Sequence, residues 1–113
     1  KWSNRALIIK DDHEIKISEQ IDNLATDFDK RDFVIIHLKN QKTFINNVEM
    51  SKKFSKSILK KIKKIHENHY FILIGKDGGI KHSYPKTIDI KEIFIDVDKM
   101  PMRMLEVERK KSN

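Results

Sequence analysis

The chain has 113 residues, a formal net charge of +7 and no cysteine. This length is typical of one domain, and the lack of cysteine excludes thiol chemistry and disulfide bonds. No apolar run approaches the roughly 20 residues that a membrane span requires, so we expect a single domain over residues 1–113 with no membrane span.

The first third of the chain is predicted to form a strand, a helix and a second strand. Residues 5–10 contain a short run of branched apolar side chains, which is typical of a central strand. Apolar residues at helical spacing then predict an amphipathic helix to about Asp29, with the carboxylates in residues 11–14 capping its start. Residues 33–38 are a second apolar run and predict another buried strand.

The middle of the chain is predicted to hold a long connection, a helix and a hairpin. Residues 39–50 show no clear period and are interpreted as a long, partly mobile connection. Ser51 is placed to cap a helix that ends near Asn68. Residues 70–84 then form a predicted hairpin, with its turn at the Asp-Gly-Gly of residues 77–79.

The last predicted helix covers residues 89–99, with Asp89 as its cap and Pro101 preventing its continuation. The predicted core therefore covers about residues 5–100. Residues 102–113 form a charged tail, which we expect to be a loose helical turn or disordered at its end.

The element order βαβαββα restricts the topology. Both crossovers should be right-handed, so strands added on opposite sides of the first strand put the first two helices on opposite faces. We predict a four-stranded mixed sheet of order 2-1-3-4. The first and third helices cover one face and the second helix covers the other, which is the thioredoxin-like arrangement.

Two motifs in the last third of the chain are similar to a known family. They are Gly-Lys-Asp-Gly-Gly-Ile-Lys at residues 75–81 and Asp-Lys-Met-Pro-Met-Arg at residues 98–103. From Arg5 to Met104 the chain resembles domain of unknown function 4174. That family includes short bacterial proteins that often carry signal peptides and the repeated domains of the vertebrate extracellular coiled-coil domain-containing protein 80. The resemblance implies a fold similar to thioredoxins and peroxiredoxins and suggests export to the periplasm or extracellular space. It implies no catalytic residues, because none is established for the family.

The sequence departs from the redox enzymes of that fold at both parts of their active site. Thioredoxins and peroxiredoxins place a nucleophilic cysteine near the start of the first crossover helix. Here residues 11–14 read Asp-Asp-His-Glu, and residues 67–70, where thioredoxins keep a cis-proline, contain no proline. We therefore predict no catalytic residue and no cofactor.

A lysine cluster in the predicted second helix is the strongest functional signal. No carboxylate occurs between Ser51 and His66, and lysines recur at i+3 and i+4 spacing over roughly 16 Å. The alternative is an ordinary solvated helix face. Like charges at i+4 destabilise a helix by a few tenths of a kcal/mol, which argues for a binding role without deciding between the two. The candidate anion-binding residues are Lys52, Lys53, Lys56, Lys60, Lys63 and Lys64.

The opposite face of the predicted sheet is expected to be acidic. Carboxylates occur along the first and last helices, so the predicted topology makes the molecule electrically two-sided. Solvated faces and capping carboxylates are the alternative explanation. The residues are Glu14, Glu19, Asp22, Asp27, Asp89, Glu92, Asp96 and Asp98.

The histidines predict no metal site. His66 and His69 are three residues apart, but no adjacent carboxylate or third histidine completes a ligand set. His13 lies among carboxylates and is a candidate acid or base, although helix capping is the favoured interpretation of that segment. We expect His37, inside a buried strand, to be a hydrogen-bonded core residue.

Apolar side chains near the two ends of the chain are a candidate contact surface for another domain or subunit. The favoured alternative is that some of them close the end of the core. These residues are Trp2, Met100, Met102 and Met104.

Our leading hypothesis is a non-enzymatic thioredoxin-like binding domain that engages an acidic polysaccharide or an acidic protein surface through its lysines. The alternative is a cysteine-independent enzyme derived from a peroxiredoxin-like ancestor, using Asp11, Asp12 and His13. Nucleic acid is disfavoured as a partner, because aromatic residues are not interleaved with the lysines to stack on bases. The sequence holds no signal for an oligomeric state.

Overall fold

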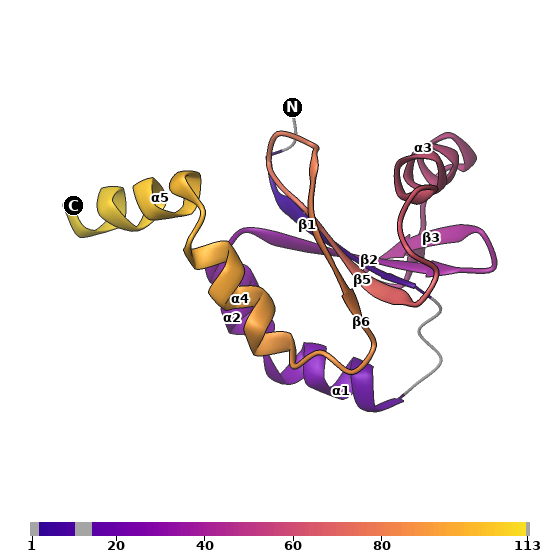
Figure 1. The fold of residues 1–113 in the computed structure, drawn as a ribbon, viewed down its shortest axis with the longest axis horizontal. Coiled ribbons are helices and arrows are strands. Elements are labelled where there is room, and N and C mark those ends of the chain that lie inside the picture. Colours follow the sequence, from indigo (N-terminus) through magenta and orange to yellow (C-terminus); the bar gives the residue numbers. More distant parts are fainter. Residues whose placement is uncertain (1–2, 11–14, 113) are drawn as a thin grey trace.

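The computed structural model describes residues 3–10 and 15–112, and within them it has one open six-stranded sheet and five helices (Figure 1). The strands are β1 Arg5–Lys10, β2 Phe33–Lys39, β3 Lys42–Ile45, β4 Val48–Glu49, β5 His69–Ile74 and β6 Ile80–Pro85. The helices are α1 Ile15–Asn23, α2 Ala25–Lys30, α3 Lys52–Ile62, α4 Ile90–Asp98 and α5 Pro101–Ser112.

The strand order of the sheet is β4-β3-β2-β1-β5-β6. Only the β1–β2 pair is parallel, and the other four pairs are antiparallel. The predicted four-stranded sheet of order 2-1-3-4 is therefore wrong, because β3 and β4 extend the sheet beyond β2. The four strands that the sequence indicated lie next to one another as β2-β1-β5-β6.

Residues 39–50 form two tight hairpins and not the predicted irregular connection. Asn40 and Gln41 have φ of 49° and 65° between β2 and β3, and Asn46 and Asn47 have φ of 52° and 65° between β3 and β4. The residues flanking each pair are partners across the ladder. Positive φ at both central residues defines the type I′ hairpin turn, and asparagine tolerates this conformation better than most residues.

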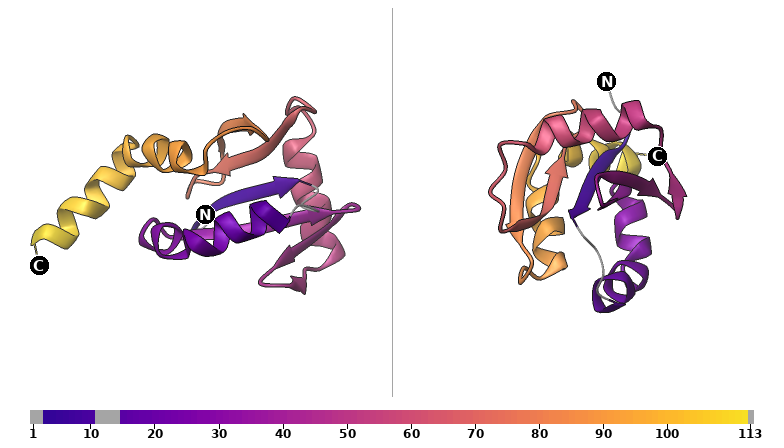
Figure 2. Two further views of the ribbon diagram at one scale, coloured as in Figure 1. Left: turned by 90° about the horizontal axis from the view of Figure 1, so that it is seen from below. Right: turned by 90° about the vertical axis from the view of Figure 1, so that its right-hand side faces the viewer.

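Helices cover both faces of the sheet (Figure 2). Alternate residues of β1 point to opposite sides, so Leu7 and Ile9 pack beneath α1, α2 and α4, whereas Ala6 and Ile8 pack against α3. All four side chains are fully buried. A central strand that is covered on both faces explains the unbroken apolar run of β1.

The predicted helix boundaries need two adjustments. The first helix is interrupted at Leu24, which has φ −105° and ψ 14° and separates α1 from α2. The second ends at Ile62, several residues before Asn68. Two predicted caps are present, since Ser51 accepts a hydrogen bond from the Phe54 N–H, and Asp89 accepts one from the N–H of the second residue of α4. The carboxylates of residues 11–14 lie outside the described residues.

The C-terminal segment is the helix α5 and not the predicted loose tail. Pro101 ends α4 as expected but is also the first residue of α5, a position that tolerates the missing N–H. The helix extends away from the sheet (Figure 1). Arg103, from the Met-Pro-Met-Arg motif, is buried and donates to the Lys30 carbonyl at 2.8 Å, which fixes the start of α5 against α2.

Candidate functional site

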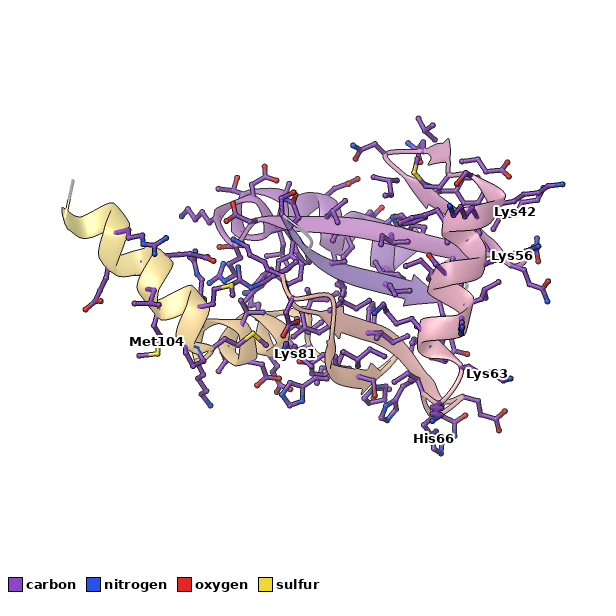
Figure 3. The ribbon with its side chains drawn as sticks, turned by 90° about the horizontal axis from the view of Figure 1, so that it is seen from above. Lys42, Lys56, Lys63, His66, Lys81 and Met104 are labelled. Carbon is purple, nitrogen blue, oxygen red and sulfur yellow. The ribbon has the colours of Figure 1, made fainter. Side chains whose placement is uncertain are left out.

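Among the described elements, helix α3 alone covers the second face of the sheet, and its amphipathic pattern determines where the candidate lysines point. Ile58 and Ile62 are buried against the sheet with Ser55 on the same side. The outward side is therefore polar, and Figure 3 shows Lys56 and Lys63 pointing away from the sheet. All six predicted residues are exposed: Lys52, Lys53, Lys56, Lys60, Lys63 and Lys64.

A buried hydroxyl pair fixes the rotation of α3 about its axis. The Oγ atom of Ser55 lies 2.8 Å from Oγ1 of Thr43 on β3 and accepts a hydrogen bond from the Thr43 N–H at 3.2 Å. Both residues are buried, Thr43 completely. Because a buried hydroxyl is expensive to leave without a partner, this pair specifies which side of α3 faces solvent.

The six lysines form no ion pair or hydrogen bond through their side chains with any residue that the structure describes. Lys61 differs from them, since it is half-buried and its Nζ donates to the carbonyl of Gly78 in the β5–β6 turn. Lys61 thus connects α3 to the hairpin, whereas the six exposed lysines hold nothing together within the described chain.

The local electrostatics of α3 leave its positive charge uncompensated. Its first turn contains no acidic residue, and Lys52 and Lys53 lie where the helix dipole disfavours cations. Lys60 lies in the last turn, where the dipole favours a positive charge. Lys63 and Lys64 follow the end of the helix and continue the basic surface past it. The site can therefore attract anions.

The described acidic residues lie on the helices of the other face or at their ends, and two of them pair with arginine. Asp98 pairs with Arg31 at 2.8 Å, and the Arg31 hydrogen bond is the main reason that the pKa of Asp98 is lowered. Asp27 pairs with Arg31 at 3.6 Å, and Asp96 accepts a hydrogen bond from the Tyr84 hydroxyl at 2.7 Å. Glu19, Asp22 and Glu92 have no such partner among the described residues, and Glu14 lies outside them.

The histidines are dispersed. The rings of His66 and His69 lie 5.5 Å apart, and His69 Nδ1 is within hydrogen-bond distance of the Ser83 hydroxyl. No group of three or more His, Asp or Glu residues within the described chain is arranged to hold a metal ion. His13 lies outside the described residues, as do Asp11 and Asp12.

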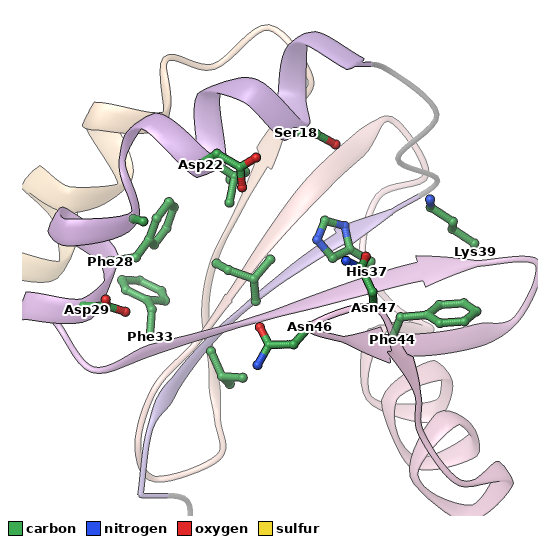
Figure 4. Close-up of a pocket in the computed structure, with 14 residues that line it drawn as sticks. Ser18, Asp22, Phe28, Asp29, Phe33, His37, Lys39, Phe44, Asn46 and Asn47 are labelled. Carbon is green, nitrogen blue, oxygen red and sulfur yellow. The ribbon is translucent and has the colours of Figure 1, made fainter.

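His37, which we expected to be a hydrogen-bonded core residue, is half-buried and lines a groove that sequence reasoning missed. The groove has a volume of about 760 Å³ and lies between α1–α2 and the β3–β4 turn (Figure 4). The available signal was the Asn46-Asn47 pair, whose turn forms the far wall of the groove. A hairpin beyond β2 leaves part of the sheet without a covering helix.

The candidate apolar patch is only partly present. Met102 and Met104 on α5 are 45% and 58% exposed, and Leu105 beside them is 52% exposed. Met100 is half-buried and packs against the core under α4. Trp2 lies outside the described residues. No described helix has the length and apolar character needed to cross a membrane.

Comparison with known proteins identifies the family without assigning an activity. No curated protein and no solved structure matches the chain. The model of one family, described as a domain of unknown function, matches residues 1–106. The chain therefore belongs to the family of domain of unknown function 4174.

Proposed function

We propose that this protein is a non-enzymatic binding domain that engages an acidic polysaccharide or an acidic protein surface through the lysine ridge, defined as Lys52, Lys53, Lys56, Lys60, Lys63 and Lys64. The observation that supports this proposal is that all six side chains are exposed and none has an anionic partner in the described chain. A linear polyanion provides several negative charges along the roughly 16 Å that separate Lys52 from Lys63.

Lysine determines the kind of recognition to expect. Its ammonium is a compact and strongly hydrated point charge, whereas arginine binds carboxylates and phosphates in a planar bidentate geometry. The ridge contains no arginine. Binding should therefore depend on charge density and respond strongly to salt, because the polymer releases counterions when the lysines replace them.

Nucleic acid remains a less suitable partner. Phe54 is the only aromatic residue of α3, and it is half-buried and packs against the apolar core between α3 and the sheet. Proteins that bind single strands without sequence preference stack bases on exposed aromatic rings. The exposed side of the ridge offers charge alone.

Heparin affinity chromatography tests the proposal. The ridge variant changes Lys56, Lys60 and Lys63 together to Glu. The control changes three other exposed lysines to Glu, on the helices of the other face or at their ends: Lys30, Lys91 and Lys99. Both variants alter the net charge equally. We expect the ridge variant to elute at much lower salt than the wild type. The slope of log K against log salt concentration should become shallower by about 2 to 3, whereas the control should stay near the wild type. Equal shifts in both variants would show that only net charge matters.

A further inference from the structure

A second surface with binding character lies on the face opposite α3. It is the groove bounded by α1 and α2 on one side, β2 as its floor and the β3–β4 turn on the other side (Figure 4). Its volume of about 760 Å³ is within the range of roughly 300–1,000 Å³ that is usual for small-molecule sites.

The groove exists because the sheet is wider than the helical layer that covers it. Helices α1, α2 and α4 pack over Leu7, Phe33 and Phe71 of the central strands. Beyond them, no described helix covers β3 on this face. Ile35 and Phe44 are therefore only half-buried and contribute apolar surface to the groove.

Most polar groups of the groove lie in its walls, and His37 of β2 adds one to the floor. Asp22 and Asp29 lie on the helical side, are exposed, and pair with no residue in the described chain. Asn46 and Asn47 present amide groups from the turn opposite. Lys39 is the remaining charged lining residue, and Figure 4 shows it at the end of the groove away from Asp29.

This arrangement selects a charge type. Two carboxylates in one wall of the groove favour a cation, and the Asn amide oxygens opposite can accept hydrogen bonds from N–H groups of a ligand. The Phe44 ring at the floor can pack against an apolar body or lie beneath a cationic head. An anion would meet both carboxylates, so the groove is chemically distinct from the lysine ridge.

We propose that this groove binds a small organic cation, namely a primary amine carried on an aromatic or aliphatic body. The ammonium lies toward the helical wall that carries Asp22 and Asp29, and the body lies over Ile35 toward Phe44. The volume suits a free small molecule, and the inference does not depend on the function proposed for the ridge.

Phenethylamine is a suitable probe, with 2-phenylethanol and phenylacetate as neutral and anionic probes of similar shape. The titration is followed by NMR through the amide signals of Phe44 and Asn47, with His66 as a remote reference. We expect saturable shifts with the amine, weaker shifts with the alcohol and none with the acid. Equal binding of amine and alcohol would overturn the proposal, because it would indicate apolar contact alone.

Matched variants make the test specific. Asp22→Asn with Asp29→Asn removes both carboxylates and should lower the affinity for the amine about fivefold or more. Glu19→Gln with Glu92→Gln removes the same charge from exposed positions outside the groove and should leave it unchanged. Binding that is unaffected by the first pair would overturn the proposal. The proposal would also be overturned if a lysine-containing peptide shifted the amide signals of Phe44 and Asn47 and phenethylamine did not.

Discussion

Arg5 and Glu106 join the first strand to the last helix by a bidentate ion pair across 101 residues of sequence. The two guanidinium nitrogens Nη1 and Nη2 each lie 3.2 Å from a different carboxylate oxygen of Glu106. Arg5 is 1% exposed, and Lys76 from the β5–β6 turn also donates to Glu106 at 2.8 Å. α5 is thus tied to three separate parts of the fold, which explains why this charged segment forms an ordered helix.

Changing Glu106 to Gln should destabilise the protein by about 2 kcal/mol. Removing one member of a buried pair leaves the other charge without compensation, and Arg5 has no access to water. The side chain of Glu106 is 15% exposed, so we expect less than the largest effects known for fully buried pairs. Urea unfolding at pH 7 measures the change. Glu92→Gln, at an exposed site, is the control, and an equal loss there would contradict the prediction.

The same carboxylate should make stability fall in acid. Burial alone would raise the pKa of Glu106, but hydrogen bonds from Arg5 and Lys76 hold it at about 2, compared with an ordinary value of 4.5. Because the folded pKa is the lower of the two, the stabilisation is complete above the unfolded pKa and is lost as the pH falls from about 4.5 to 2.

Urea midpoints of the wild type and of Glu106→Gln between pH 7 and pH 2 measure this effect. Other carboxylates contribute to both curves, so the informative quantity is their difference, which should shrink towards acid pH. Parallel curves would show that Glu106 does not titrate with folding.

For Lys76 the dependence of stability on pH runs in the opposite direction. Despite burial, Asp32 and Glu106 raise the pKa of Lys76, so its contribution is complete below 10.5 and is lost above it.

The hydroxyl pair of Thr43 and Ser55 should behave as one unit. Ser55→Ala leaves the Thr43 hydroxyl and N–H without their partner, whereas Thr43→Val removes only the hydroxyl contact, because the N–H of residue 43 still donates to Ser55 Oγ. We expect a cost of about 1 to 2 kcal/mol for each, with the larger loss for Ser55→Ala. The double variant should lose less than the sum of the two single variants. A double-mutant cycle by urea unfolding measures the coupling. Strict additivity would mean that the 2.8 Å contact does not orient α3 as the geometry suggests.

Sequence reasoning succeeded where burial dictated the pattern and failed where a turn residue decided the structure. The apolar run of residues 6–9 can only be a strand covered on both faces, and the spacing of Ile58 and Ile62 fixes the outward side of α3. Asn46 and Asn47 lie in a segment that was interpreted as a connection because it has no clear period, whereas their positive φ forms a type I′ turn. The hairpin, the groove and the width of the sheet were missed together for that reason.

The C-terminal helix was missed for a different physical reason. Residues 101–112 are rich in charge and weakly amphipathic, so no apolar stripe predicts a packed helix. The stabilising contacts come from Arg103 and Glu106, whose partners lie on distant segments. Long-range ion pairs leave no periodic trace in a sequence, whereas apolar packing does.

Asn47 provides a direct test of the second hairpin. Its φ of 65° is strained for a β-branched residue and unstrained for glycine, which is the preferred residue at the second position of a type I′ turn. Asn47→Gly should therefore be neutral or stabilise the protein by up to about 1 kcal/mol, and Asn47→Val should destabilise it by about 1 to 3 kcal/mol. Asn68 is exposed and does not have a positive φ, so the same two changes there serve as the control. Thermal and urea unfolding measure all four variants. If Asn47→Val were as stable as the wild type, β4 would not be held by this turn, and the far wall of the groove would have no fixed position.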